Sequence, residues 1–507
     1  MRRALVALFV LVLAGLPLAP AALGQEGPAQ KDFTFYGSGF GHGLGMSQWG
    51  AYGLSKDGWA APRILTHFYS GTKVAKEGSP PNRLRIGLAQ GRGFVRLEAQ
   101  EGDVEIRLEN RKTGDVVATI PSGETWRVRV ADDEYRILDA SGATVDRVGG
   151  PATPIFAVFQ PQGARVRVPE AGHTYNRGWI EFGLYGCSPG CDLRLVLEIT
   201  PQEYLYGLGE VPSSWPVDAL ETQAIAARTY AFTKAAASQH RAGCDCALYA
   251  SSFDQVYAGW DKEGGADGDR WVDAVDDTKN RVVMDGGTTI QAFYMSSSGG
   301  HTEDNENVWG GTAIDYLRGV CDPGDYTADN PNALWEITYE ASKVTKELSL
   351  GIGTVVGFAN AQRGISGRIV SVMVNGENGS EPISGATLRS ALGLRDDRVW
   401  INKDRQIEGE IRRKYDALGC SPGLPTTPQV QVAGGIRQKF EGATIYFKDG
   451  IGAHSLRDPV LAFYLSEGGP TGRLGFPTSD VRTTENGNLR ASFEHGAITC
   501  SATSCST

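Results

Sequence analysis

Alternating apolar and polar residues fill short stretches between positions 84 and 199, and turn residues separate these stretches. Residues 104–108 and 126–130 are two clear examples. A period of two places successive side chains on opposite faces of a strand, so this part of the chain predicts a β-sheet. Residues 216–239 differ, because a proline suited to a first helical turn precedes an alanine-rich sequence, and they predict one long helix.

The last hundred residues contain an internal repeat. Residues 438–445 resemble residues 491–498, and residues 414–419 resemble residues 463–469. Two tandem units of roughly fifty residues are typical of a module that binds rather than catalyses. We therefore expect an α+β fold, in which a mixed, β-rich domain with one long central helix precedes a small C-terminal repeat module.

The N-terminus has the pattern of a secretory signal peptide. Arg2 and Arg3 precede an apolar stretch at 4–18, and Ala22-Leu23-Gly24 then offers small residues at the two positions that a signal peptidase reads. We predict cleavage after Gly24 and a secreted, extracellular protein, in which disulfides are the ordinary use of cysteine. The alternative, a membrane anchor, is disfavoured because the apolar run is shorter than the ~20 residues that a span needs. No other segment predicts a transmembrane helix.

The net negative charge of the chain argues against one class of partner, nucleic acid. The 507 residues include 49 Lys and Arg against 59 Asp and Glu, which gives a net charge of −10. An acidic chain lacks the basic surface that neutralises phosphates, so nucleic acid is not expected as a partner. Hydrophobic residues make up 41% of the chain, enough for a sizeable core and against general disorder.

One candidate for acid–base chemistry is Glu210, in a turn rich in glycine and proline just before the predicted helix. Val211, Pro212 and Trp215 can exclude water from its carboxyl group, which raises the pKa as a general acid requires. The nearby helix N-terminus favours the anion instead. Capping of the helix is the alternative role for this residue.

Two further motifs and the helix offer polar side chains for a ligand. Glycines surround a histidine at 39–51, and a strand enters a polar, glycine-rich loop at 291–303. A phosphate-binding loop is disfavoured, because the Lys–Ser/Thr pair of such loops is missing here. The candidate binding residues are His42, Ser47, Gln48, Arg228, Tyr230, Tyr294 and Ser297.

These motifs together resemble the SpoIID/LytB family, which comprises stage II sporulation protein D and amidase enhancers. The matching stretches are residues 210–212, 223–231, 254–259, 292–303, 309, 316–317, 384–389 and 392–394, with the block Gly-His-Gly-x-Gly-Met-Ser-Gln at 41–48. In the sporulation proteins this block lies near the C-terminal end of the domain. Residues 33–75 therefore look permuted here, and we expect folding to bring His42 to Glu210.

The C-terminal repeats resemble a second known family. Residues 474–477 read Leu-Gly-Phe-Pro, and with their surroundings they are similar to the LGFP repeat of bacterial envelope proteins. This resemblance implies that the repeats hold the protein to the cell wall. The predicted division is a signal peptide at 1–24, a SpoIID/LytB-like domain at 25–405 and two repeats at 406–507. The middle domain has the permuted segment at 33–75, a β-rich part at 84–200 and a catalytic core at 201–405.

The family resemblance implies a lytic transglycosylase that acts on peptidoglycan glycan strands without a cofactor. Glu210 is then the catalytic acid and base, and the seven candidate binding residues position the sugar. The alternative is a non-catalytic amidase enhancer that binds glycan and stimulates a peptidoglycan amidase. A zinc peptidase is disfavoured, because the chain has no His-Glu-x-x-His helix.

Eight cysteines divide unevenly along the chain. Five precede residue 405 and three follow it, so complete intrachain pairing needs at least one bridge across this boundary. Cys500 and Cys505 can close a local loop. Because some sporulation relatives carry zinc near this point, His240, Cys244 and Cys246 raise a zinc site as an alternative. Asp254 stands where those relatives have a cysteine ligand, and export favours disulfides.

Overall fold

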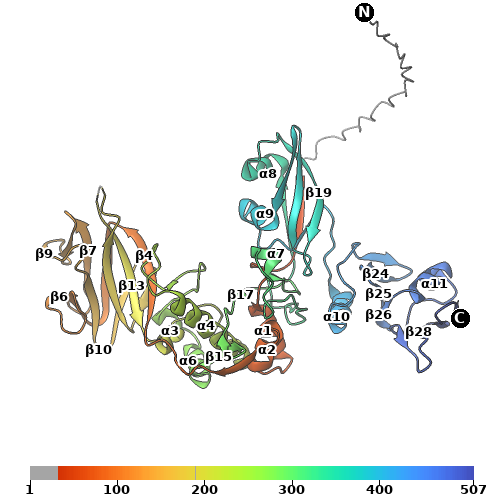
Figure 1. Cartoon of the computed structure of the whole chain (residues 1–507), viewed down its shortest axis with the longest axis horizontal. Helices are drawn as coiled ribbons and strands as arrows, with labels where there is room; N and C mark the ends of the chain where they lie inside the picture. The colour runs from red at the N-terminus through yellow and green to blue at the C-terminus, as the bar shows by residue number, and fades with distance from the viewer. Residues whose placement is uncertain (1–31, 189) are drawn as a thin grey trace, which may run out of the picture.

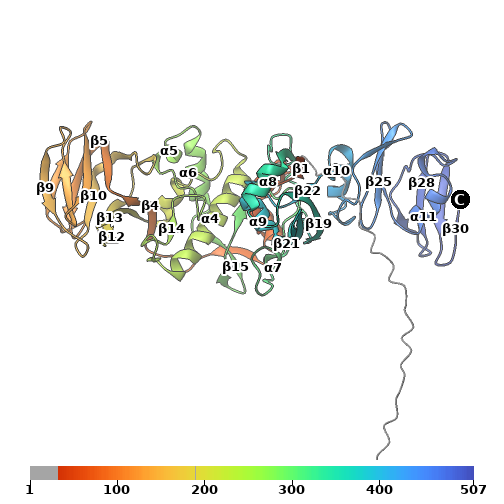
Figure 2. The same cartoon turned by 90° about the horizontal axis from the view of Figure 1, so that it is seen from above.

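The structure is a computed structural model that describes residues 32–188 and 190–507. The fold is α+β, and the molecule is elongated, with a β-rich end, a helical middle and the C-terminal repeats at the other end (Figure 1). Figure 2 shows the same order of parts from above. The predicted signal peptide lies outside the described residues. Within the described ranges, no helix combines the length and apolar character that a membrane span requires.

The stretches predicted as strands do form a sheet, of eleven strands. In β12, for example, Ile180, Phe182 and Leu184 are buried and alternate with more exposed residues, as a period of two predicts. All pairs in this sheet are antiparallel except that of β14 with β4. The strands are β4 (Leu84–Arg92), β5 (Phe94–Leu108), β6 (Val116–Ile120), β7 (Thr125–Ala131), β8 (Glu134–Leu138), β9 (Thr144–Val148), β10 (Ile155–Val168), β11 (His173–Tyr175), β12 (Trp179–Tyr185), β13 (Asp192–Ile199) and β14 (Leu248–Tyr249).

The predicted helix at 216–239 is α4 (Val217–Ala237), with 21 residues. Its buried side chains lie on every side, and many are alanines, which let neighbouring elements approach closely. Elements from both sides of α4 in sequence surround it. They include α3 (Pro201–Tyr206), α6 (Gly268–Asp277), β15 (Arg281–Asp285) and β16 (Thr288–Thr289), while β3 (Lys73–Lys76) pairs with β15 and α5 (Trp260–Glu263) packs against α6.

The N-terminal segment joins elements that lie far along the chain. β1 (Asp32–Gly37) pairs antiparallel with both β18 (Trp335–Glu340) and β22 (Val399–Ile401). β2 (Met46–Ser47) pairs in parallel with β17 (Tyr294–Met295). Two helices, α1 (Gln48–Lys56) and α2 (Ala61–Phe68), then pack against α4. The segment thus becomes part of the core.

A smaller sheet packs beside this segment. β19 (Val355–Arg363), β20 (Ile369–Gly376) and β21 (Gly379–Ser384) form an antiparallel meander. Its apolar face shares one hydrophobic cluster with β1, α8 (Ala341–Leu348) and α9 (Gly385–Leu392). Figure 1 shows α7 (Asn305–Trp309) between α9 and β17, so this sheet stands close to the N-terminal segment.

The two C-terminal units have the same construction, as their sequence similarity predicts. Each has a helix and a four-stranded antiparallel sheet. In the first unit Tyr415 stacks on Phe440, and in the second Tyr464 stacks on Phe493, at ring distances of 5.1 and 4.7 Å. The elements are α10 (Gly409–Ala417), β23 (Val430–Val432), β24 (Gly435–Lys439), β25 (Thr444–Lys448), β26 (Gly452–Leu456), α11 (Val460–Ser466), η1 (Gly469–Thr471), β27 (Arg482–Thr483), β28 (Leu489–Phe493), β29 (Gly496–Cys500) and β30 (Cys505–Ser506).

All eight cysteines form disulfides. The pair Cys500–Cys505 closes the local loop that the sequence predicted. The bridge that must cross residue 405 is Cys321–Cys420, which joins a core loop to the first repeat. The remaining bridges are Cys187–Cys191 and Cys244–Cys246.

Candidate functional site

Three segments that are distant in sequence meet at Glu210. Its half-buried side chain lies in the loop between α3 and α4. The Val256 backbone N–H donates to Oε1 at 2.6 Å, and the Gln48 side chain donates through Nε2 to Oε2 at 3.3 Å. The N-terminal segment therefore reaches Glu210 through Gln48.

The carboxyl group of Glu210 has a raised pKa. Burial is the largest cause, and the hydrogen bonds from Val256, Gln48 and Tyr294 oppose it. The sequence left open whether desolvation or the anion-stabilising contacts would prevail, and in the structure desolvation prevails. A half-buried carboxyl that keeps its proton to higher pH than usual suits a general acid.

A chain of buried hydrogen bonds orients Tyr294 towards Glu210. The Tyr294 hydroxyl accepts a bond of 2.9 Å from Nε2 of Gln255, whose Oε1 accepts one of 3.0 Å from the Tyr204 hydroxyl. Because Gln255 is fully buried, its amide fixes the position of the Tyr294 oxygen and leaves the Tyr294 proton for Glu210. Residues Tyr204 and Gln255 were not among the predicted site residues.

Tyr230 also lies within electrostatic reach of Glu210. Its hydroxyl donates to Oδ1 of Asp254 at 3.0 Å. Asp254 also pairs with two basic side chains. Arg241 donates to its other oxygen at 2.6 Å, and Nζ of Lys234 lies 3.4 Å from Oδ1. Tyr230 therefore contributes its ring to the surroundings of Glu210, while its hydroxyl is held by another carboxylate.

Three predicted binding residues are corrected by their contacts, because their polar atoms are used inside the protein. Ser47 and Ser297 both donate to Asp325, each at 2.9 Å, and both are buried. Arg228 is also buried. It donates to the carbonyl oxygens of Val275 and Arg281 at 3.0 and 3.2 Å. These side chains stabilise the fold rather than face Glu210.

Among the described residues, His42 makes no hydrogen bond or ion pair with Glu210, the residue that it was expected to approach. The His42 ring packs edge-on to Phe293 at 6.3 Å, and the Tyr230 ring lies 6.0 Å from the same phenylalanine. The Nδ1 atom of His42 accepts a hydrogen bond from the Leu44 N–H. Phe293 thus contacts both rings, and His42 lines a pocket beside Trp309.

The glycines of the 39–51 motif allow the close packing of β2 on β17. At Gly45 the backbone has φ of +68°, and a Cβ atom there would lie 2.1 Å from the Phe293 carbonyl oxygen. A side chain at this position would push the two strands apart. The glycines of this motif therefore permit the close contact of β2 with β17, and Gln48, which follows β2, lies beside Glu210.

Three aromatic rings that lie close to Gln48 or Glu210 in the sequence pack against one another. Trp49 packs against Trp215 at a ring distance of 4.9 Å, and Tyr52 lies 5.1 Å from both. Trp49 and Tyr52 are only half-buried. Such rings offer apolar faces with a polar edge, which suits the faces of a sugar. From the sequence, Trp215 was expected only to desolvate Glu210, and Trp49 and Tyr52 were not predicted as site residues.

The zinc alternative is contradicted by the cysteine pairing. Cys244 and Cys246 are bonded to each other, so neither sulfur is a free thiolate ligand. The third residue of that alternative, His240, has its Nδ1 atom 2.7 Å from Oδ1 of Asp245. These three residues therefore do not form a zinc site.

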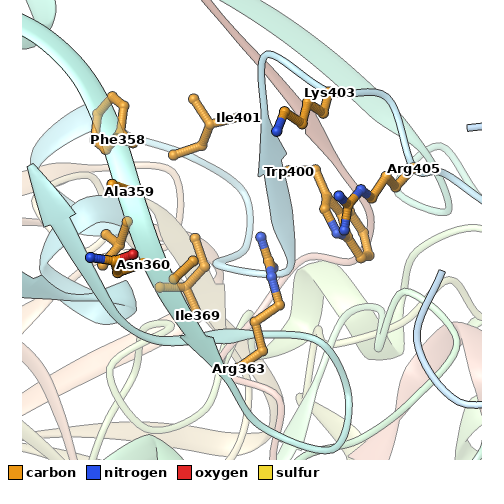
Figure 3. A pocket seen from close by; sticks show the side chains of 11 residues that line it. Phe358, Ala359, Asn360, Arg363, Ile369, Trp400, Ile401, Lys403 and Arg405 are labelled. Carbon is orange, nitrogen blue, oxygen red and sulfur yellow. The ribbon is translucent and has the colours of Figure 1, made fainter. Parts of the chain in front are cut away.

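A further pocket lies on the small sheet, away from the predicted site residues. It has a volume of about 300 Å³ and is lined by apolar residues of β19, β20 and β22 together with Arg363, Lys403 and Arg405. Figure 3 shows these basic side chains beside Trp400. Arg363 is held by the carbonyl oxygens of Gly367 and Val399.

Comparisons with known proteins agree with both resemblances. Residues 191–284 match the family model described as SpoIID, stage II sporulation protein, and residues 423–472 match that of the LGFP repeat. The first match contains Glu210, α4 and Gln255. The resemblance predicted from the motifs is thus confirmed for these segments.

Individual relatives cover different shares of the chain. The amidase enhancer of Bacillus subtilis (strain 168) is 33% identical over 142 residues, which are 28% of this chain and 17% of that protein. The stage II sporulation protein D of the same strain is 27% identical over 243 residues, 45% of this chain and 67% of that protein. That of Bacillus amyloliquefaciens is 28% identical over 218 residues, 40% and 61% respectively. The matched part of the chain therefore spans 17% of the amidase enhancer's length.

Proposed function

We propose that this protein is a peptidoglycan lytic transglycosylase with Glu210 as its acid and base. The observation that carries the proposal is a single half-buried carboxyl of raised pKa, contacted by Gln48, Val256 and Tyr294. The similarity to stage II sporulation protein D and the cluster of Trp49, Tyr52 and Trp215 support the same interpretation.

The reaction uses the carboxyl group twice. Protonated Glu210 gives its proton to the glycosidic oxygen between N-acetylmuramic acid and N-acetylglucosamine, and the C1–O bond breaks. The carboxylate then takes the proton of the muramyl C6 hydroxyl as O6 bonds to C1. The products are a 1,6-anhydromuramyl end and a new N-acetylglucosamine end. Glu210 regains its proton, and no water is consumed.

The surroundings of Glu210 fit one carboxyl better than two. Ordinary glycosidases place two carboxyl groups on either side of the scissile bond. Among the described residues, Asp254 is the carboxylate that accepts the hydrogen bond of Tyr230. It also accepts bonds from Arg241 and the Tyr249 N–H. Asp254 is therefore a poor base for activating a hydrolytic water. Attack by the substrate's own hydroxyl needs no second carboxylate, because Glu210 itself takes that proton.

In this proposal the protein acts outside the cell, on the wall. The repeat match at 423–472 supports binding of the C-terminal units to envelope polymers, so that they hold the enzyme near its glycan. A second function has its own support. The similarity to a protein named amidase enhancer favours a non-catalytic role, in which the chain binds glycan and stimulates a peptidoglycan amidase.

The deciding experiment uses peptide-free glycan strands and the full chain. We expect the protein to release 1,6-anhydromuramyl fragments, detected by mass spectrometry, and Glu210→Gln to lower the rate roughly a thousandfold, as the loss of a general acid does. Glu221→Gln is the matched control. Glu221 is also half-buried with a raised pKa, but it lies on α4 and its pKa is set by other neighbours.

Equal rates for Glu210→Gln and the parent protein would contradict the transglycosylase. Stimulation of an added amidase, without glycan products from this chain alone, would select the enhancer instead.

A further inference from the structure

The pocket beside His42 is distinct from the surroundings of Glu210. It has a volume of about 420 Å³ and lies between α7 and α9, in the size range of small-ligand sites. Its lining residues are His42, Val308, Trp309, Ala386, Arg389, Ser390, Gly393, Leu394 and Asp397. Phe293 contacts aromatic residues of both regions, since its ring lies 4.6 Å from that of Trp309 and 6.0 Å from that of Tyr230.

Trp309 presents an unusual aromatic surface in this pocket. Its side chain is 54% exposed, although its ring packs against both His42 and Phe293. An exposed tryptophan that is held in place by its neighbours loses little freedom when a ligand covers it. The ring face can therefore bind a flat, partly apolar ligand such as a sugar ring.

Arg389 supplies a free positive charge. It is half-buried, and it makes no ion pair or side-chain hydrogen bond with any residue that the structure describes. Its charge acts on the pocket, because it contributes, after burial itself, to lowering the pKa of His42 to about 4. His42 is thus neutral at neutral pH, and Arg389 stands ready to bind an anion.

Asp397 adds a carboxyl group to the same pocket. Its Oδ1 is buried without a hydrogen-bond partner among the described residues, and Nε of Arg368 lies 3.6 Å from this oxygen. Burial, with Asp396 next in importance, raises the pKa of Asp397 to about 7, and the charges of Arg368 and Arg389 oppose this shift. The pocket therefore combines an anion-binding guanidinium with a weakly acidic carboxyl that can bond a hydroxyl group.

We propose that this pocket is a second subsite for the glycan strand, which takes a sugar bearing a carboxylate. The sugar ring lies on Trp309 and its carboxylate binds Arg389. This inference rests on the proposed function for the identity of the polymer. The acidic sugar of that strand is N-acetylmuramic acid, with its lactyl carboxylate. A strand held both in this pocket and at Glu210 is fixed at two points.

The test measures binding without cleavage, in full-length protein that carries Glu210→Gln. The probes are a tetrasaccharide of alternating N-acetylglucosamine and N-acetylmuramic acid with free lactyl carboxylates, and chitotetraose, which has none. By calorimetry we expect the acidic probe to bind about tenfold more tightly, as one charge-assisted hydrogen bond provides. Arg389→Gln should remove this preference, Arg389→Lys should restore part of it, and Trp309→Ala should weaken both probes.

Arg405→Gln is the matched control. Arg405 is also half-buried and has no ion pair among the described residues, but it lines the pocket of Figure 3. It should leave the preference for the acidic probe unchanged. Thermal melting shows whether each variant is folded. Equal affinity of the parent for both probes, or an unchanged preference in folded Arg389→Gln, would overturn the subsite.

Failure of the proposed catalysis gives a different result. The preference for the acidic probe would then persist, while the protein with Glu210 intact releases no anhydromuramyl product.

Discussion

Two carboxylates, Glu210 and Asp325, receive side chains from the same short motif but have different environments. Ser47 donates to Asp325, and its neighbour Gln48 donates to Glu210. Asp325 is fully buried and accepts bonds from two serine hydroxyls and the Ser298 N–H. Glu210 keeps part of its surface exposed and has fewer donors.

The difference shows what separates a structural carboxylate from one available for chemistry. Asp325 has no surface for a ligand, because its neighbours occupy its oxygens. Burial raises its pKa, as it raises that of Glu210. A raised pKa is therefore shared by both groups, and only Glu210 combines it with access.

The largest effect that tests this comparison is on stability. Asp325→Ala removes the acceptor of the Ser47 and Ser297 hydroxyls and one of the two acceptors of the Ser298 N–H, so we expect the free energy of unfolding to fall by about 3 kcal/mol. Urea denaturation followed by tryptophan fluorescence measures this. Asp329→Ala is the control, because Asp329 is exposed and its pair with Lys56 should contribute little to stability. An equal loss of unfolding free energy in both variants would contradict a structural role for Asp325.

The next effect separates the two neighbours within the motif. Gln48→Ala removes a donor to Glu210, and we expect about a tenfold lower rate of glycan cleavage with little change in stability. Ser47→Ala removes both the bond to Asp325 and the cap on Gly50 of α1, so it should cost about 1–2 kcal/mol of stability. Folded Ser47→Ala protein should cleave at the parent rate. The reverse pattern would show that the two side chains had been assigned to the wrong carboxylates.

The smallest effect concerns pH. Because cleavage begins from protonated Glu210, the rate should fall as pH rises through its raised pKa. The bond from Gln48 stabilises the carboxylate, so its removal in Gln48→Ala raises the pKa further. The alkaline limb of the rate profile should therefore move to higher pH in this variant. A shift to lower pH would mean that Gln48 favours the protonated form.

Local patterns in the sequence predicted much of the fold. Alternation indicated the strands of the large sheet, and the alanine-rich stretch indicated α4, because both signals come from neighbouring residues. The repeat and the odd cysteine counts predicted the equivalent C-terminal units and the bridge across residue 405.

The site was harder to predict, since it depends on pairing between distant segments. Glu210 and Gln48 were found because each belongs to a recognisable motif. No local pattern indicates that Ser47 reaches Asp325 instead, because that outcome follows from how β2 meets β17, about 250 residues later. Asp325 and Gln255 were missed for the same reason, as their importance comes from burial beside partners on other segments.

The Cys321–Cys420 bridge has a mechanical consequence. The chain leaves the core after β22 and enters the first repeat at α10. Tension on the repeats would otherwise reach the core through the short strand β22, which pairs with β1, and through non-covalent contacts such as those of Gln406 with the carbonyl oxygens of Gly37 and Trp335. The bridge offers a second, covalent route for that force into the loop at Cys321. When force is applied to the C-terminal repeats, the bridge can therefore carry part of it, so that β22 need not separate from β1 first.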